Sequence, residues 1–260
     1  VTQPDQELRR LTKGGLIRAL DEAMTAYLPV PVERAGEVLG LSAPGAALLS
    51  LLRDKVPTPP SPLLPRAGLV QALRAQIDQR KAVLLTGSVF KGKTTVAQLV
   101  ARSRCPDAWW LPLRGRSLDQ VDTLLLALAR EVDADTAPAL IIIDDLDVSA
   151  EAYRVVGSSV SLVIHRAIAS GRGVVLTAQG SPTSAQAFSD VPHLHIVDVP
   201  ELGEGEIQDL CVLGGCPQAF ARAVAFVIHA RTRGHPKLVQ IRLAELSKEG
   251  WATPELSAMT

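Results

Sequence analysis

The chain has 260 residues, enough for one large domain or for a medium domain with small additions. Hydrophobic residues make up 47% of it, which excludes a disordered chain. The formal net charge is zero, so the sequence does not predict nucleic acid or an anionic membrane as a general partner. With three cysteines in no zinc spacing, and neither a membrane-spanning run nor a signal-like N-terminus, a cytoplasmic location is expected.

The first part of the chain, residues 1–55, is predicted to be a small helical unit. Leu8, Leu11, Leu16 and Leu20 fall at helical spacing within it. Residues 56–65 follow with five prolines and are predicted to form a stiff, extended linker. This linker is the clearest domain boundary in the sequence.

Beyond the linker, strand and helix patterns alternate. The predicted strands are apolar throughout, which is typical of a parallel sheet covered on both faces. We therefore expect an α/β domain over residues 66–200. Its strands are expected at 82–86, 109–113, 139–143, 173–177 and 195–199, and its helices at 69–79, 93–103, 118–132 and 150–169. From residue 201 to 255 only helical patterns appear, which predicts a helical subdomain with helices at 203–213, 217–232 and 236–248.

A phosphate-binding loop is predicted where the first strand meets its helix. The segment Gly87–Thr95 reads Gly-Ser-Val-Phe-Lys-Gly-Lys-Thr-Thr and satisfies G-x-x-x-x-G-K-[ST]. Gly87 and Gly92 let the backbone turn its amides towards phosphate groups. Lys93 supplies positive charge to the β- and γ-phosphates, and the Thr94 hydroxyl is the expected Mg²⁺ ligand.

Two residues inside this loop are unusual. Phe90 stands where many such loops have a glycine, and it either narrows the pocket or packs outward. Lys91 stands where a small or apolar residue is common. It is predicted to add a cation near the phosphates, with a solvated lysine as the alternative.

The strand expected at 139–143 ends in two carboxylates, Asp144 and Asp145. A buried parallel strand carries such residues to the carboxyl edge of the sheet, where ligands of open α/β folds bind. Asp144 is predicted to hold Mg²⁺, mainly through water. Asp145 is the predicted catalytic residue, because it is placed to orient an attacking water.

These motifs together resemble the STAND class of signalling NTPases, which includes the NB-ARC and NACHT modules. The resemblance covers about residues 62–248 and implies an α/β parallel-sheet P-loop NTPase of AAA+/STAND-like fold. The features that carry it are Pro65-Arg66, the double Thr94-Thr95, the segment Ile143-Asp144-Asp145-Leu146, and the late Gly234-His235-Pro236.

The resemblance implies a switch that binds ATP or ADP with Mg²⁺. In the family, a His or Pro of the late motif meets the nucleotide phosphates in the closed, ADP-bound form, so His235 and Pro236 become nucleotide contacts. Arg66 and Thr95 are nucleotide contacts by the same implication. Gln179 stands where the family often has an arginine that senses the γ-phosphate, and it can donate a hydrogen bond but brings no charge.

In this reading slow ATP hydrolysis controls a closed-to-open change, and opening permits self-association. Effector or sensor domains outside this chain would be the further partners. Two alternatives stay open. One is an AAA+-like ATPase that acts on DNA or protein, against which Gln179 and the neutral charge count. The other is a nucleotide-binding scaffold that does not hydrolyse, for which Phe90 and Gln179 argue. Arg114 and Arg116 fit either a solvated loop or an arginine finger.

Overall fold

The computed structural model describes residues 56–59, 61–179 and 183–251. The helical unit expected at residues 1–55 lies outside the described residues. Within them, five strands form one parallel sheet in the order β2-β3-β4-β1-β5. The strands are β1 (Ala82–Thr86), β2 (Trp109–Pro112), β3 (Leu140–Asp147), β4 (Gly173–Gln179) and β5 (Leu194–Asp198).

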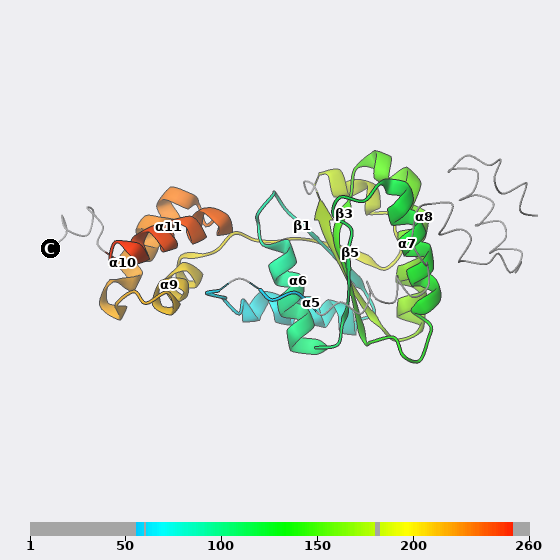
Figure 1. Ribbon diagram of the computed structural model, residues 1–260, viewed down its shortest axis with the longest axis horizontal. Coiled ribbons are helices and arrows are strands. Elements are labelled where there is room, and N and C mark those ends of the chain that lie inside the picture. Colours follow the sequence, from blue (N-terminus) through cyan, green and yellow to red (C-terminus); the bar gives the residue numbers. More distant parts are fainter. Residues whose placement is uncertain (1–55, 60, 180–182, 252–260) are drawn as a thin grey trace, which may run out of the picture.

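Helices cover both faces of this sheet (Figure 1). One face carries α5 (Ala67–Asp78) and α6 (Lys93–Arg104). The other carries α7 (Leu118–Glu131), α8 (Ala150–Ala169) and the short 3₁₀ helix η1 (Ser184–Phe188). The α/β parallel-sheet class predicted from the sequence is confirmed.

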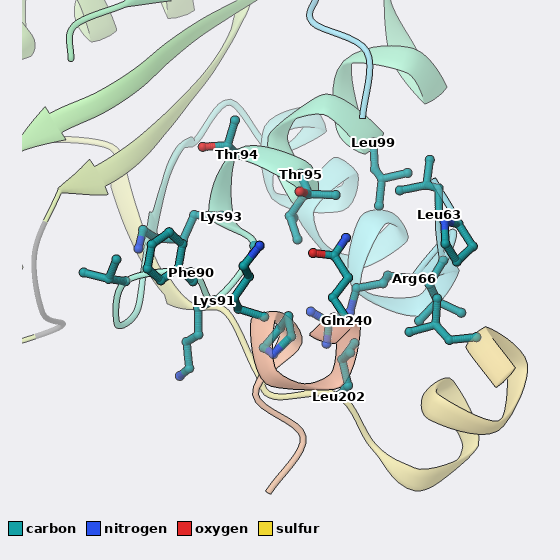
Figure 2. Close-up of a pocket in the computed structure, with 18 of the residues that line it drawn as sticks. Leu63, Arg66, Phe90, Lys91, Lys93, Thr94, Thr95, Leu99, Leu202 and Gln240 are labelled. Carbon is teal, nitrogen blue, oxygen red and sulfur yellow. The ribbon is translucent and has the colours of Figure 1, made fainter. Parts of the chain in front are cut away.

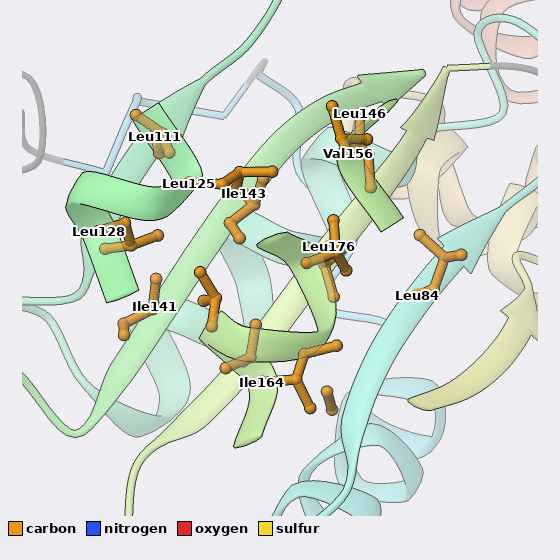
Figure 3. Close-up of a cluster of buried hydrophobic side chains, with 14 of the residues drawn as sticks. Leu84, Leu111, Leu125, Leu128, Ile141, Ile143, Leu146, Val156, Ile164 and Leu176 are labelled. Carbon is orange, nitrogen blue, oxygen red and sulfur yellow. The ribbon is translucent and has the colours of Figure 1, made fainter. Parts of the chain in front are cut away.

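The strands are apolar throughout because each supplies side chains to two cores. Successive residues of a strand point to opposite faces, so Trp109 packs towards α7 and α8 while Trp110 packs towards α5 and α6. Figure 3 shows the first of these cores, with Ile141, Ile143 and Leu176 of the sheet facing Leu125 and Leu128 of α7. Both tryptophans are buried.

Strand β3 is longer than the 139–143 expected from its apolar run. It continues through the carboxylates and pairs again with β4 at Leu146 and Asp147, after an irregularity between Ile143 and Leu146. Asp145 takes a left-handed backbone (φ 63°), and its N–H donates to the Thr177 hydroxyl at 2.9 Å. The apolar run ends before Asp144, but β3 goes on pairing with β4 beyond it. A bulge accommodates the one extra residue that β3 has there.

The C-terminal helices α9 (Glu204–Leu213), α10 (Gln218–Thr232) and α11 (Pro236–Lys248) have a core of their own. They lie at one end of the molecule, beyond α5 and α6 (Figure 1). Cys211 and Cys216 are buried on either side of the turn between α9 and α10, and burial raises the pKa of Cys211 to about 12. Among the described residues, none of the helices is both long and apolar enough to cross a membrane.

Candidate functional site

The predicted phosphate loop connects β1 to α6 and requires its two glycines. Gly87 has φ 136°, and a Cβ there would lie 2.6 Å from the Lys91 side chain. Gly92 has φ 84° and is the N-cap of α6. Both backbones are in a region that side chains rarely adopt. Phe90 also has a positive φ of 65°, and it is 67% exposed while it also lines the pocket described below.

Lys93 begins α6, and its ammonium group lies within the loop. Its Nζ donates to the carbonyl oxygens of Gly87 at 2.8 Å and Ser88 at 2.9 Å. Burial lowers the pKa of Lys93, while the nearby Asp145 carboxylate opposes that shift. The loop thus holds a positive charge at the N-terminus of a helix, the arrangement that binds phosphate groups.

The two predicted magnesium ligands lie side by side. The Thr94 hydroxyl donates to Asp144 Oδ1 at 2.9 Å, and the Thr177 hydroxyl of β4 donates to the same oxygen at 2.7 Å. Burial raises the pKa of Asp144, and these two hydrogen bonds oppose the shift. A buried carboxylate beside a hydroxyl oxygen fits a hard divalent cation, whose charge would offset the cost of burial.

Asp145 lies next to this pair but has a different partner. Its Oδ2 accepts from Arg114 Nε at 2.6 Å, and both residues line the same pocket. The Asp145 side chain is 12% exposed, whereas that of Arg114 is 79% exposed. Arg114 is therefore ion-paired within its own chain, while Arg116 donates to the Pro112 carbonyl. Both arginines were candidates from the sequence, but the contact between Arg114 and Asp145 was not predicted.

The end of β4 lies between β1, which leads into the phosphate loop, and β3, which carries Asp144 and Asp145. The sheet order places β4 between β1 and β3, and Gln179 pairs with Asp147 in the ladder. The backbone of Gln179 is thus at the predicted edge of the sheet. Its side chain lies outside the part of the chain that the structure describes.

A pocket of about 420 Å³ lies between the phosphate loop and the helical subdomain. Figure 2 shows Phe90, Lys91, Lys93 and Thr94 on one side of it. The rest of the wall is largely apolar and comes from the linker, α6 and the helical subdomain. These residues include Leu63, Leu64, Leu99, Leu202, Leu210, Gln240 and Leu243. Thr95 and Pro236, both predicted as nucleotide contacts, also line the pocket.

The late motif holds the helical subdomain against the phosphate loop. His235 Nε2 lies 3.2 Å from the Val89 carbonyl oxygen, which can only accept, so Nε2 carries the proton. His235 Nδ1 is buried without a hydrogen-bond partner among the described residues. Gly234 lies against Leu202, whose N–H donates to the Gly234 carbonyl at 2.9 Å. The motif thus contacts the loop backbone directly.

Arg66 lines the pocket, but its guanidinium group bonds to the segment that enters the helical subdomain. It donates to the carbonyl oxygens of Pro200 at 3.0 Å and Glu201 at 3.3 Å, and it pairs with the Glu206 carboxylate at 3.0 Å. The guanidinium N–H groups that would contact a nucleotide, as predicted, therefore already donate to protein oxygens.

Sequence reasoning missed the apolar wall. Leu63 and Leu64 belong to the segment interpreted as a proline-rich linker, and they line the pocket instead of only spacing two domains. The available signal was a pair of adjacent leucines in a run that is otherwise mostly proline. Leu99 and Gln240 gave no local signal, because ordinary helix patterns explain them.

Comparisons with known proteins support the fold. No protein-family model matches the chain, and no curated protein matches it. Among solved structures, domain III of the replication initiation protein DnaA from Thermotoga maritima is 15% identical with a TM-score of 0.50. That match covers 75% of this chain and 94% of the DnaA domain. The Holliday junction branch migration motor RuvB from the same organism is 17% identical with a TM-score of 0.47, over 71% of this chain and 59% of RuvB.

This chain therefore shares the fold of DnaA domain III, and its own sheet has five parallel strands with helices on both faces. At such identities the similarity extends to the fold alone. The comparisons do not reach the finer STAND class. They also give no support to the expectation that nucleic acid is not a partner.

Proposed function

We propose that this chain binds ATP or ADP with Mg²⁺ and works as a slow nucleotide switch of the STAND type. The observation that carries the proposal is the position of the pocket. The phosphate loop forms one wall, and α11 of the helical subdomain, through Pro236 and Gln240, forms part of another. A nucleotide in this pocket would contact both units and would stabilise their closed arrangement.

Each part of the pocket suits one part of the nucleotide. Lys93 and the loop amides would bind the phosphates, while Thr94 and Asp144 would hold Mg²⁺, which would neutralise phosphate charge. The leucine wall suits an apolar, flat base. Asp145 is the carboxylate placed to orient a water molecule at the phosphates.

The proposed hydrolysis is slow because Asp145 is engaged elsewhere. An oxygen that accepts the short bond from Arg114 is a weaker acceptor for a water proton. Closed, nucleotide-bound protein would then persist. Opening would expose the phosphate-loop side of the helical subdomain, and we propose that self-association follows, with effector or sensor domains as further partners.

A second candidate is an AAA+-like ATPase that acts on DNA or protein, and the fold shared with DnaA domain III favours it. Steady turnover tests both candidates. A switch is expected to hydrolyse ATP below about 0.01 s⁻¹, as nucleotide switches without a stimulating partner do. Addition of single- or double-stranded DNA should leave that rate unchanged. A rate that DNA raises tenfold would favour the second candidate. Clear binding without any hydrolysis would favour the scaffold.

Arg114→Ala is expected to raise the turnover rate roughly tenfold, since it frees an acid–base group whose full effect is about 10²–10⁴-fold. ATP affinity should change little, because the ion pair is with the protein. A phosphate-release assay at saturating ATP checks this. Arg116→Ala is the matched control, as it removes a neighbouring guanidinium that donates to the Pro112 carbonyl and not to Asp145. A lower rate in Arg114→Ala would mean that Arg114 acts on the phosphates instead.

A further inference from the structure

Lys91 is a charged residue with little access to solvent. It lies in the phosphate loop, yet its side chain is only 12% exposed. Its Nζ is 3.0 Å from Asp198 Oδ2 and 3.7 Å from Glu201 Oε1. The aliphatic part of the side chain packs across Gly87, where a Cβ would lie 2.6 Å from Lys91 Cδ. The alternative of a solvated lysine is therefore wrong.

The two carboxylates belong to the segment that attaches the helical subdomain. Asp198 is the last residue of β5, and Glu201 lies three residues before α9 begins at Glu204. We call residues 198–203 the hinge segment. Lys91 thus ties the phosphate loop to the hinge segment, and Arg66 holds the same segment from the other side through backbone carbonyls.

Charge in this cluster is unbalanced. Arg66 bonds to the backbone of Glu201 and not to its carboxylate, so Lys91 is the cation within 4 Å of both carboxylates among the described residues. Glu201 Oε2 is buried without a hydrogen-bond partner in the described part of the chain. The Asp198 and Glu201 side chains are 50% and 38% exposed, so water solvates them in part, and the Lys91 ammonium group is the cation that pairs with both. Lys91 stands one residue from Gly92 and two from Lys93.

A nucleotide phosphate at the loop would compete for that ammonium group and would repel the carboxylates. We propose that Lys91 couples the phosphate charge of the bound nucleotide to the hinge segment, so that a triphosphate loosens the tie more than a diphosphate. The inference rests on the proposed nucleotide site and adds the element through which it acts on the helical subdomain. Linkage makes the effect reciprocal, so a loosened hinge favours the triphosphate.

Amide hydrogen exchange at Leu202 tests the coupling, since Leu202 belongs to the hinge segment and its N–H donates to the Gly234 carbonyl of the helical subdomain. The wild-type protein is expected to exchange at least about fivefold faster with Mg²⁺ and a non-hydrolysable ATP analogue than with ADP. Lys91→Met keeps the packing across Gly87 and removes the charge. It should bring the ADP-bound rate to within about twofold of the ATP-analogue rate.

Glu201→Gln is the second variant and weakens the same tie from the hinge side, without altering the phosphate loop. In this variant too, the exchange rates of the Leu202 amide with ADP and with the ATP analogue should become similar. Asp78→Asn is the control, because it removes the carboxylate that pairs with Arg104, between α5 and α6. It should keep the wild-type difference.

Nucleotide binding is measured by calorimetry on the same samples. If the nucleotides bind and both variants keep the full wild-type difference at Leu202, the coupling is overturned and the proposed function stands. If the wild-type protein binds neither nucleotide, the proposed function fails and the coupling fails with it. Loss of the difference in both variants, with nucleotide still bound, supports the coupling.

Discussion

Lys93→Ala is expected to weaken ATP and ADP binding at least about 100-fold, which corresponds to roughly 2.8 kcal/mol. The Lys93 ammonium group is held in the loop by the Gly87 and Ser88 carbonyls. Without it, phosphate groups would face the Asp144 and Asp145 carboxylates with one cation fewer between them. Calorimetric titration with either nucleotide and Mg²⁺ measures the change.

Lys81→Ala is the matched control for that prediction. Lys81 precedes β1 at its amino end, while the phosphate loop follows β1 at the other end, so the control removes the same charge away from the pocket. Its nucleotide affinity should equal that of the wild-type protein. Equal affinities in all three proteins would show that the loop does not bind phosphate.

Gly234→Ala is expected to lower the free energy of unfolding by about 2–4 kcal/mol. A Cβ at this position would lie 2.1 Å from the Leu202 carbonyl oxygen, which is backbone and cannot rotate away. The backbone φ of 75° adds strain for any residue with a side chain. The contact between the Gly-His-Pro motif and the hinge segment should separate. Thermal unfolding should show a decrease in Tm of roughly 10 °C.

Gly215→Ala is the control that separates the steric clash at Gly234 from the strain of a left-handed backbone. Gly215 has φ 91° in the turn between α9 and α10, and its added Cβ would meet nothing within 4 Å. It should cost only about 1 kcal/mol, the strain of a left-handed backbone. If the two variants lose the same stability, the close approach of Gly234 to Leu202 carries no energy of its own.

The parts of the fold that the sequence predicts are those with local signals. Apolar runs locate the strands because each strand is buried on both faces, and G-x-x-x-x-G-K-T locates the loop because its chemistry needs those residues in order. The predicted end of β3 was wrong, because the bulge at Asp145 depends on a hydrogen bond to Thr177 of the neighbouring strand β4. No property of residues 139–147 alone encodes that partner.

Long-range contacts account for the rest of the site. Arg66 pairs with Glu206 across 140 positions, and Arg114 with Asp145 across 31. The sequence shows that such charges exist but not which ones meet. Lys91 illustrates the difference. Its unusual place in the loop was visible from the motif, whereas its carboxylate partners follow only from the way β5 lies beside β1.

We propose that the pocket between the phosphate loop and the helical subdomain holds a nucleotide. The most direct test is to denature the purified protein and identify released nucleotide by chromatography, with Lys93→Ala beside it. A ligand present at a thousand times its Kd adds about 4 kcal/mol of stability, so a closed site would keep ADP through purification. We predict close to one ADP per wild-type chain and none from Lys93→Ala. A wild-type protein that releases no nucleotide, and binds none when titrated with Mg²⁺ and ATP, would show that this pocket is not a nucleotide site.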